Sequence, residues 1–173
     1  GLGGDSVEQI VCVQAEQQQR RRPHRRRRSG SSGEPLFCSL EDQQHRLTAS
    51  GFDVAAGMKN PTSGDMSVML NSVYAAQHPH SFTYRGWEVE TTGNELTHTV
   101  LRGAVNKHGN NVPNYHYEDL NLLLELYGRM DLMYPACVID ANHSNSGKQF
   151  EQQIRITKEV MHSRRLNPDI HSL

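Results

Sequence analysis

Residues 53–77 read DVAAGMKNPTSGDMSVMLNSVYAAQ, and this stretch decides the fold class. Its apolar first part, which closes at Lys59, predicts a short buried strand, and the turn residues 60–64 follow it. Asp65 is a typical N-cap, and Met66, Met69, Leu70 and Val73 recur at helical spacing, which predicts a helix through residue 77. A buried strand, a turn and an amphipathic helix in this order form one βα unit.

The same alternation continues toward the C-terminus. Apolar runs predict strands at residues 97–101 and 136–140, and helical spacing predicts helices at 117–130 and 148–164. Ile154, Ile156 and Val160 are the expected apolar face of the last helix. Residues 81–84 and 87–91 alternate around Arg85-Gly86, which predicts a hairpin. Strands and helices in this order predict an α/β protein built around a parallel sheet.

Residues 1–36 differ in chemistry from the rest of the chain. Positions 20–28 hold seven arginines, and the Gly/Ser-rich segment 29–33 that follows is typical of a flexible linker. Because clustered arginines repel one another and bury nothing, we predict a disordered tail at 1–36 and a folded domain at 37–173. A nucleic-acid-binding arm is one interpretation of the tail. A solvated tail without nucleic-acid partner is favoured, because no aromatic residues are interleaved with the arginines.

Composition excludes several classes of protein. No stretch approaches the ~20 apolar residues of a transmembrane helix, so no membrane partner is expected. The first residues lack the basic start and apolar centre of a signal peptide. Cys12, Cys38 and Cys137 are too widely spaced for a disulfide framework or a zinc cluster. We therefore expect a cytoplasmic location.

Each of the three main predicted strands ends in polar residues that can carry chemistry. Lys59 and Arg102 end two of them, and His143 lies just after the third. Because sites in βα folds lie at the carboxyl ends of strands, these side chains predict an anionic, phosphorylated substrate. From the residues alone, Lys59 could also be an ordinary exposed lysine and Arg102 a member of a surface ion pair. His143 could be a metal ligand, a general base or a capped loop residue.

Six stretches together resemble a known family. They are residues 43–51 (QQHRLTASG), 57–64 (GMKNPTSG), 76–82 (AQHPHSF), 101–103 (LRG), 113–115 (PNY) and 140–150 (DANHSNSGKQF). In this order they resemble the central-to-late part of class I DAHP synthases (3-deoxy-D-arabino-heptulosonate 7-phosphate synthases, also called phospho-2-dehydro-3-deoxyheptonate aldolases). The resemblance covers residues 39–173 and includes nothing in 1–36.

The resemblance implies a transferase that condenses phosphoenolpyruvate with erythrose 4-phosphate to DAHP and phosphate, the first step of the shikimate pathway of aromatic amino acid biosynthesis. It implies that Lys59 and Arg102 bind phosphoenolpyruvate, and that Lys59 and His143 are catalytic. His143 would also ligate a divalent metal ion, either Mn, Fe, Co or Zn. The family fold is a (β/α)₈ TIM barrel of about 250 residues, so this chain would be a fragment supplying a partial barrel, about half of it. Full-length relatives are expected to be homo-oligomers.

The departures from the family pattern concern the same site. Cys38 stands where the family has a phosphate-binding arginine, and the remaining metal ligands of the family, a Cys, a Glu and an Asp, have no counterpart in this sequence. We therefore expect this chain alone to be inactive. The alternative is a non-enzymatic chain whose arginine-rich arm binds nucleic acid or a protein partner.

Overall fold

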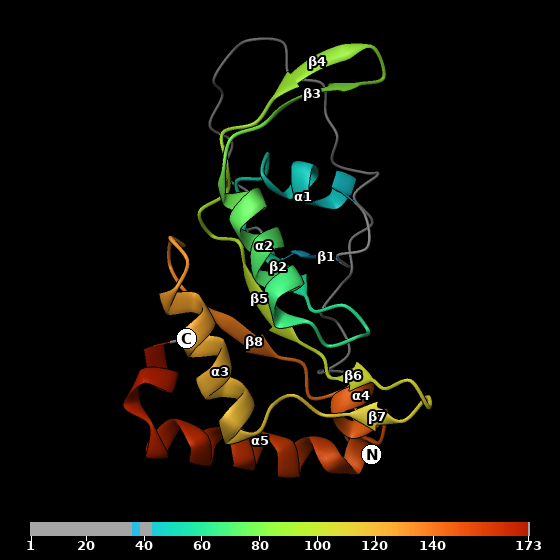
Figure 1. The fold of residues 1–173 in the computed structure, drawn as a ribbon, viewed down its shortest axis with the longest axis vertical. Helices are drawn as coiled ribbons and strands as arrows, with labels where there is room; N and C mark the ends of the chain where they lie inside the picture. The colour runs from blue at the N-terminus through green and yellow to red at the C-terminus, as the bar shows by residue number, and fades with distance from the viewer. Residues whose placement is uncertain (1–35, 39–42, 173) are drawn as a thin grey trace, which may run out of the picture.

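A computed structural model describes residues 36–38 and 43–172 of the 173-residue chain. Figure 1 shows an α/β fold in which short strands alternate with helices. The strands are β1 (Leu36–Cys38), β2 (Ala56–Lys59), β3 (Ser81–Tyr84), β4 (Trp87–Glu90), β5 (His98–Leu101), β6 (Ala104–Val105), β7 (Asn111–Val112) and β8 (Cys137–Ile139). The helices are α1 (Gln43–Ala49), α2 (Met66–Gln77), α3 (Tyr117–Gly128), α4 (His143–Ser146) and α5 (Phe150–Leu166), followed by the 3₁₀ helix η2 (Pro168–Ser172).

A parallel sheet of the order β1-β2-β5-β8 lies at the centre of the described fold. In the register of this sheet, Met58 of β2 pairs with Thr99 of β5, and Thr99 pairs with Cys137 of β8. The two remaining pairs, β3-β4 and β6-β7, are separate antiparallel ribbons. The predicted parallel sheet and the predicted hairpin are therefore confirmed, although β2 begins at Ala56 rather than at Asp53.

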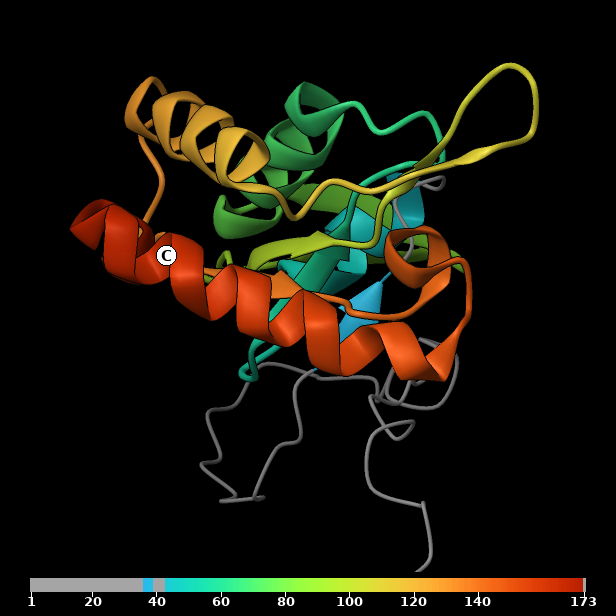
Figure 2. The same cartoon turned by 90° about the horizontal axis from the view of Figure 1, so that it is seen from below.

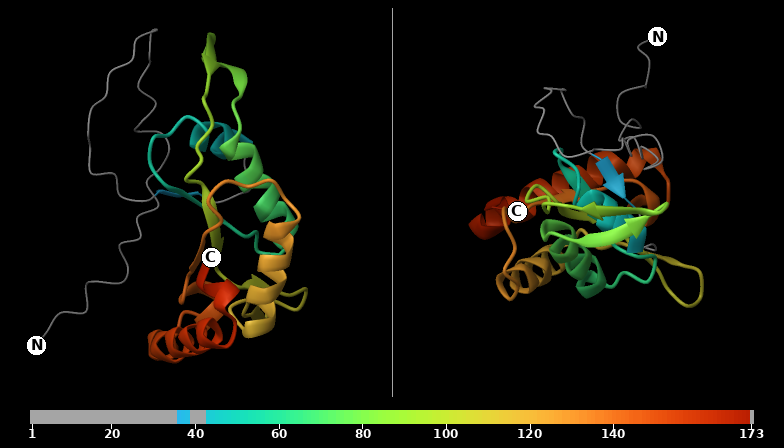
Figure 3. Two further views of the ribbon diagram at one scale, coloured as in Figure 1. Left: turned by 90° about the vertical axis from the view of Figure 1, so that its left-hand side faces the viewer. Right: turned by 90° about the horizontal axis from the view of Figure 1, so that it is seen from above.

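The core lies between one face of the sheet and the helices α2 and α3, which cover it (Figures 2 and 3). Five of the core side chains are at most 1% exposed. They are Met58 and Leu101 of the sheet and Leu70, Val73 and Leu123 of the two helices. The Asp65 side chain caps α2 by accepting from the backbone N–H groups of the helix's first turn, at 2.8 and 3.2 Å. Helical spacing and its cap therefore predicted α2 correctly, from Met66 to residue 77.

The hydroxyl of Tyr127 connects α3 to the sheet through polar contacts. It donates to the carbonyl oxygen of Ala136 at 2.7 Å, and the same hydroxyl oxygen lies 3.2 Å from Oγ1 of Thr99. Burial raises the pKa of Tyr127 to about 12, because the phenolate loses its hydration there. The hydroxyl stays protonated at neutral pH and holds the helix over β5 and the start of β8.

Several features differ from the sequence prediction. The helix α1 and the β6-β7 ribbon were not predicted, and β1 begins at Leu36, one residue inside the predicted tail. Ile154 was predicted on the buried face of the last helix, and this prediction is wrong, since the side chain is 67% exposed. The reason is that α5 crosses the end of the molecule near α4 and buries only the side that carries Ile156 and Ser163 (Figure 1).

The rest of the predicted tail, residues 1–35, lies outside the described residues, so its disorder stays a prediction. No helix of the described part combines the length and the apolar composition that a membrane crossing requires.

Replacing Leu123 with alanine is expected to lower the free energy of unfolding by about 2–5 kcal/mol, because the side chain is fully buried and its loss leaves a cavity. The neighbouring Leu122 provides the matched control, since it is 47% exposed, and its replacement by alanine should cost less than about 1 kcal/mol. Urea unfolding followed by circular dichroism measures both. Equal losses would contradict the placement of the core under α3.

Candidate functional site

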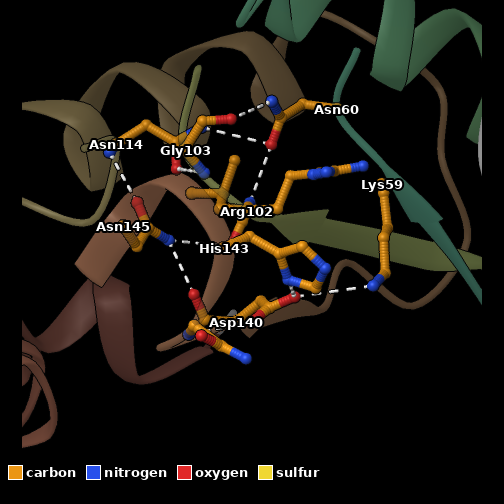
Figure 4. A network of polar contacts seen from close by, with 10 residues as sticks. Lys59, Asn60, Arg102, Gly103, Asn114, Asp140, His143 and Asn145 are labelled. Atoms are coloured by element: carbon orange, nitrogen blue, oxygen red, sulfur yellow. Dashed lines mark hydrogen bonds and ion pairs between the residues drawn. The ribbon is translucent and has the colours of Figure 1, made fainter. Parts of the chain in front are cut away.

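The carboxyl ends of β2, β5 and β8 bring Lys59, Arg102 and His143 to the same end of the sheet. Lys59 is the last residue of β2, Arg102 follows β5 directly, and His143 begins α4 after β8. Figure 4 shows the three side chains together with Asp140, which follows β8. Because all three strands are parallel, their ends share one edge, as the sequence predicted.

Asp140 connects two of these side chains. Its Oδ2 lies 3.5 Å from Nζ of Lys59 and 2.7 Å from Nδ1 of His143. The contact between Asp140 and Nδ1 of His143 is short, but the orientation of the imidazole does not meet the angles of a hydrogen bond. Oδ1 of the same carboxylate accepts the backbone N–H of Asn142 at 2.9 Å. With a carboxylate side chain only 15% exposed, Asp140 holds the lysine and the histidine against each other.

The backbone around His143 is held in an unusual conformation. His143 has a φ of 46°, in the left-handed region that non-glycine residues rarely adopt. Gly103 approaches this turn so closely that a Cβ on it would lie 2.7 Å from the backbone of Ser144 and Asn145. The backbone N–H of Ser144 also donates to the carbonyl oxygen of Arg102 at 3.1 Å. The ends of β5 and β8 are therefore packed backbone to backbone, which requires glycine at position 103.

The guanidinium of Arg102 has no carboxylate partner among the residues that the structure describes. Asp140, the acid labelled in Figure 4, contacts Lys59 and His143 instead. The predicted alternative of a surface ion pair for Arg102 is thus absent from the described part of the chain. An unpaired guanidinium beside a lysine leaves this end of the sheet with an excess of positive charge that suits an anion.

Three buried asparagines surround this site, and sequence reasoning missed all of them. Asn60, Asn114 and Asn145 are 2%, 6% and 3% exposed, and their side chains hydrogen-bond to the backbones of the loops after β2, β5 and β8 (Figure 4). Asn60 follows Lys59, and Asn145 comes two residues after His143. Their position beside candidate site residues was the available signal, but no spacing rule distinguishes a buried asparagine from one in an exposed turn.

The residues present do not make up a metal site by themselves. No three His, Cys, Asp or Glu side chains in the described part of the chain gather closely enough to hold an ion. His143 supplies one nitrogen, and the carboxylate next to it already pairs with Lys59. One imidazole and one shared carboxylate fall short of the three or four ligands that transition metals take in proteins.

Cys137, at the start of β8, has a structural role. Cys137 packs against the core from β8, and burial raises the pKa of its thiol to about 12. It therefore remains a protonated, unreactive thiol at neutral pH. Cys38 ends β1 in register with Met58, which places it one residue short of the level of Lys59.

Comparison with known proteins gives consistent results. The sequence profile of the DAHP synthetase I family matches residues 38–165. Phospho-2-dehydro-3-deoxyheptonate aldolase from Haemophilus influenzae is 38% identical over 130 residues, which are 70% of this chain and 33% of that protein. The enzyme of the same name from Corynebacterium glutamicum is 35% identical over 127 residues, which are 70% of this chain and 32% of that protein.

A solved structure shares the fold. Phospho-2-dehydro-3-deoxyheptonate aldolase from Francisella tularensis superimposes with a TM-score of 0.68 and 28% sequence identity, covering 78% of this chain and 40% of its own. The chain spans about a third of the length of the Haemophilus influenzae and Corynebacterium glutamicum relatives.

Proposed function

The chain belongs to the DAHP synthetase I family, and on that premise we propose that it is part of an enzyme that condenses phosphoenolpyruvate with erythrose 4-phosphate to DAHP and phosphate. In this proposal the end of the sheet at Lys59 and Arg102 is the binding site for phosphoenolpyruvate. The proposed enzyme is a transferase of aromatic amino acid biosynthesis. A cytoplasmic location and homo-oligomeric full-length relatives stay predictions.

The observation that carries the proposal is the guanidinium of Arg102, which lies next to Lys59 and has no carboxylate partner among the described residues. Phosphoenolpyruvate has a carboxylate and a phosphate, and a planar guanidinium can bind either with two parallel hydrogen bonds. The lysine adds a compact positive charge that can meet the second anionic group. Holding both groups fixes the substrate in one orientation, and the two cations balance negative charge as phosphate leaves.

His143 has a proposed role as the family's metal ligand. One nitrogen does not hold a catalytic ion, and the described donor set does not supply the remaining ligands. No step of the reaction is therefore assigned to a metal on this chain. What His143 does in the structure is to share the carboxylate of Asp140 with Lys59.

We further propose that the parallel sheet is part of a (β/α)₈ barrel. Four parallel strands, with α2 and α3 covering one face, are the arrangement that half of such a barrel requires. The alternative of a nucleic-acid-binding or protein-binding arm concerns residues 20–28, which lie outside the described residues, and no observation on the structure favours it.

Isothermal titration of the purified chain with phosphoenolpyruvate tests the proposal. Binding is expected, and pyruvate should bind at least about tenfold more weakly, because it lacks the phosphate and its charge-assisted hydrogen bonds. Equal affinity for the two ligands, or no binding of either, would contradict an anion site built from Lys59 and Arg102.

A further inference from the structure

We propose that Asn60, Asn114 and Asn145 act as one positioning unit, here called the amide triad, which sets the backbone of Arg102 and Gly103 against the segments that carry Lys59 and His143. The inference deepens the proposed function, on which its consequence for substrate binding rests. Figure 4 shows the three side chains arranged as a connected network beside the charged residues. The three asparagines come from different parts of the fold: Asn60 follows β2, Asn114 follows β7 and Asn145 lies in α4.

The first link joins the end of β2 to the end of β5. Oδ1 of Asn60 accepts the backbone N–H of Arg102 at 2.9 Å, and Nδ2 of Asn60 donates to the carbonyl oxygen of Gly103 at 2.9 Å. One amide thus holds the peptide groups on both sides of the Arg102–Gly103 pair. The residue next to Lys59 in sequence therefore determines where the arginine leaves its strand.

The second link runs through Asn114 to the turn after β8. Oδ1 of Asn114 accepts the backbone N–H of Gly103 at 2.7 Å, and its Nδ2 donates to Oδ1 of Asn60 at 3.2 Å. Its own backbone N–H donates to Oδ1 of Asn145 at 2.9 Å. Nδ2 of Asn145 in turn donates to the carbonyl oxygens of Leu101 at 3.1 Å and Asp140 at 2.8 Å. The network therefore ends at Asp140, whose carboxylate contacts Lys59 and His143.

The backbone partners determine the orientation of every amide. Each asparagine oxygen faces at least one backbone N–H, and Asn60 and Asn145 also direct their nitrogens at backbone carbonyls, so exchanging O and N would bring like groups together. A neutral amide both donates and accepts, so it can bond to backbone N–H and carbonyl groups where the side chain is less than a tenth exposed. A charged side chain there would carry a large desolvation cost.

The hydrogen bonds that link the three asparagines are the reason to expect that they act as one unit rather than independently. Removal of one buried amide leaves its partners without hydrogen bonds, and buried polar groups without partners are unfavourable. Loss of Asn60 would orphan the Arg102 N–H directly. It would also leave Nδ2 of Asn114 without an acceptor, which loosens the group that holds Gly103.

Native-state hydrogen exchange on the chain with Asn60→Ala tests this without any ligand. Exchange of the Arg102, Gly103 and Asn114 amides is expected to accelerate together, by about tenfold or more, although only the first of these N–H groups bonds to Asn60. Asn114→Asp provides a second variant of nearly unchanged size. It replaces a donor by an acceptor facing Oδ1 of Asn60 and should show the same joint acceleration. Acceleration confined to the Arg102 amide in Asn60→Ala, or unchanged exchange of all three amides in Asn114→Asp, would overturn the proposal.

Asn94→Ala is the matched control. Asn94 is 4% exposed and also makes three hydrogen bonds with the backbone, to the carbonyls of Ala49 and Val54 and from the N–H of Leu96. It lies before β5, at the amino end of the sheet. We expect this variant to lose stability while leaving the exchange of Arg102, Gly103 and Asn114 unchanged.

Titration with phosphoenolpyruvate connects the triad to binding. The titrations use fully folded protein without denaturant. If the unaltered chain binds phosphoenolpyruvate, Asn60→Ala and Asn114→Asp should each lower the affinity by about tenfold, whereas Asn94→Ala should leave the affinity unchanged. Equal weakening by all three variants would mean that the triad acts only through stability, and would overturn its positioning role. Failure of the unaltered chain to bind phosphoenolpyruvate would contradict the proposed function, while hydrogen exchange would still decide whether the triad is one unit.

Discussion

Replacing Arg102 with alanine is expected to weaken the binding of phosphoenolpyruvate by about a hundredfold or more. Two charge-assisted hydrogen bonds of ~1.5–3 kcal/mol each would be lost with the guanidinium. Because no carboxylate of the described residues pairs with Arg102, its removal leaves no buried acid uncompensated, and stability should change little. Isothermal titration measures the affinity, and thermal unfolding checks that the variant is folded.

Arg129→Ala is the matched control for this experiment. Arg129 lies at the end of α3, where it pairs with Glu125 on an exposed surface, and its side chain is 66% exposed. Its replacement removes one arginine and the same positive charge from the chain, but at a distance from the strand ends. Affinity for phosphoenolpyruvate should stay within about twofold of the unaltered chain. If Arg102→Ala binds as tightly as this control, the anion site lies elsewhere.

The second large effect concerns catalysis by the chain alone, for which we expect no measurable turnover of phosphoenolpyruvate and erythrose 4-phosphate. His143 is the one nitrogen ligand of the proposed metal site, and the described residues gather no group of three metal-binding side chains. Affinity for a transition metal depends on the number of ligands, so excess Mn²⁺ should not restore a catalytic ion.

A second shortage adds to the first. Cys38 stands where the resemblance implies a phosphate-binding arginine, and a thiol cannot replace the charge-assisted hydrogen bond of a guanidinium. The loss of phosphoenolpyruvate absorbance with both substrates and Mn²⁺ measures turnover. A full-length relative serves as the positive control in the same assay. Turnover by this chain at a rate comparable to that control would show the expectation to be wrong.

Local pattern alone predicted most of the fold. Apolar runs located β2, β5 and β8, and helical spacing located α2, α3 and α5, because both periodicities are properties of a few consecutive residues. The family resemblance predicted for residues 39–173 is confirmed by the match to the family profile, which covers residues 38–165. The short elements α1, β6 and β7 were missed, since they contain too few residues for a period to be recognised.

The sequence by itself also determined that Lys59, Arg102 and His143 lie at one end of the sheet. Parallel strands that alternate with helices have their carboxyl ends at a common edge, so three residues at strand ends must meet there. Their catalytic and binding roles stay predictions. Ile154 marks the limit of this reasoning, because periodicity identifies an apolar side of a helix without saying which neighbour, if any, covers it.

Only the tertiary structure decided how the site is held together. The carboxylate of Asp140 reaches Lys59 across 81 positions of sequence, and Asn60 reaches Asn114 across 54. Such contacts depend on how closely the loops after β2, β5 and β8 approach one another, and Gly103 permits that approach where a Cβ would collide. A hydrogen bond requires its two heavy atoms within about 3.5 Å, and spacing along the chain does not encode that distance between separate segments.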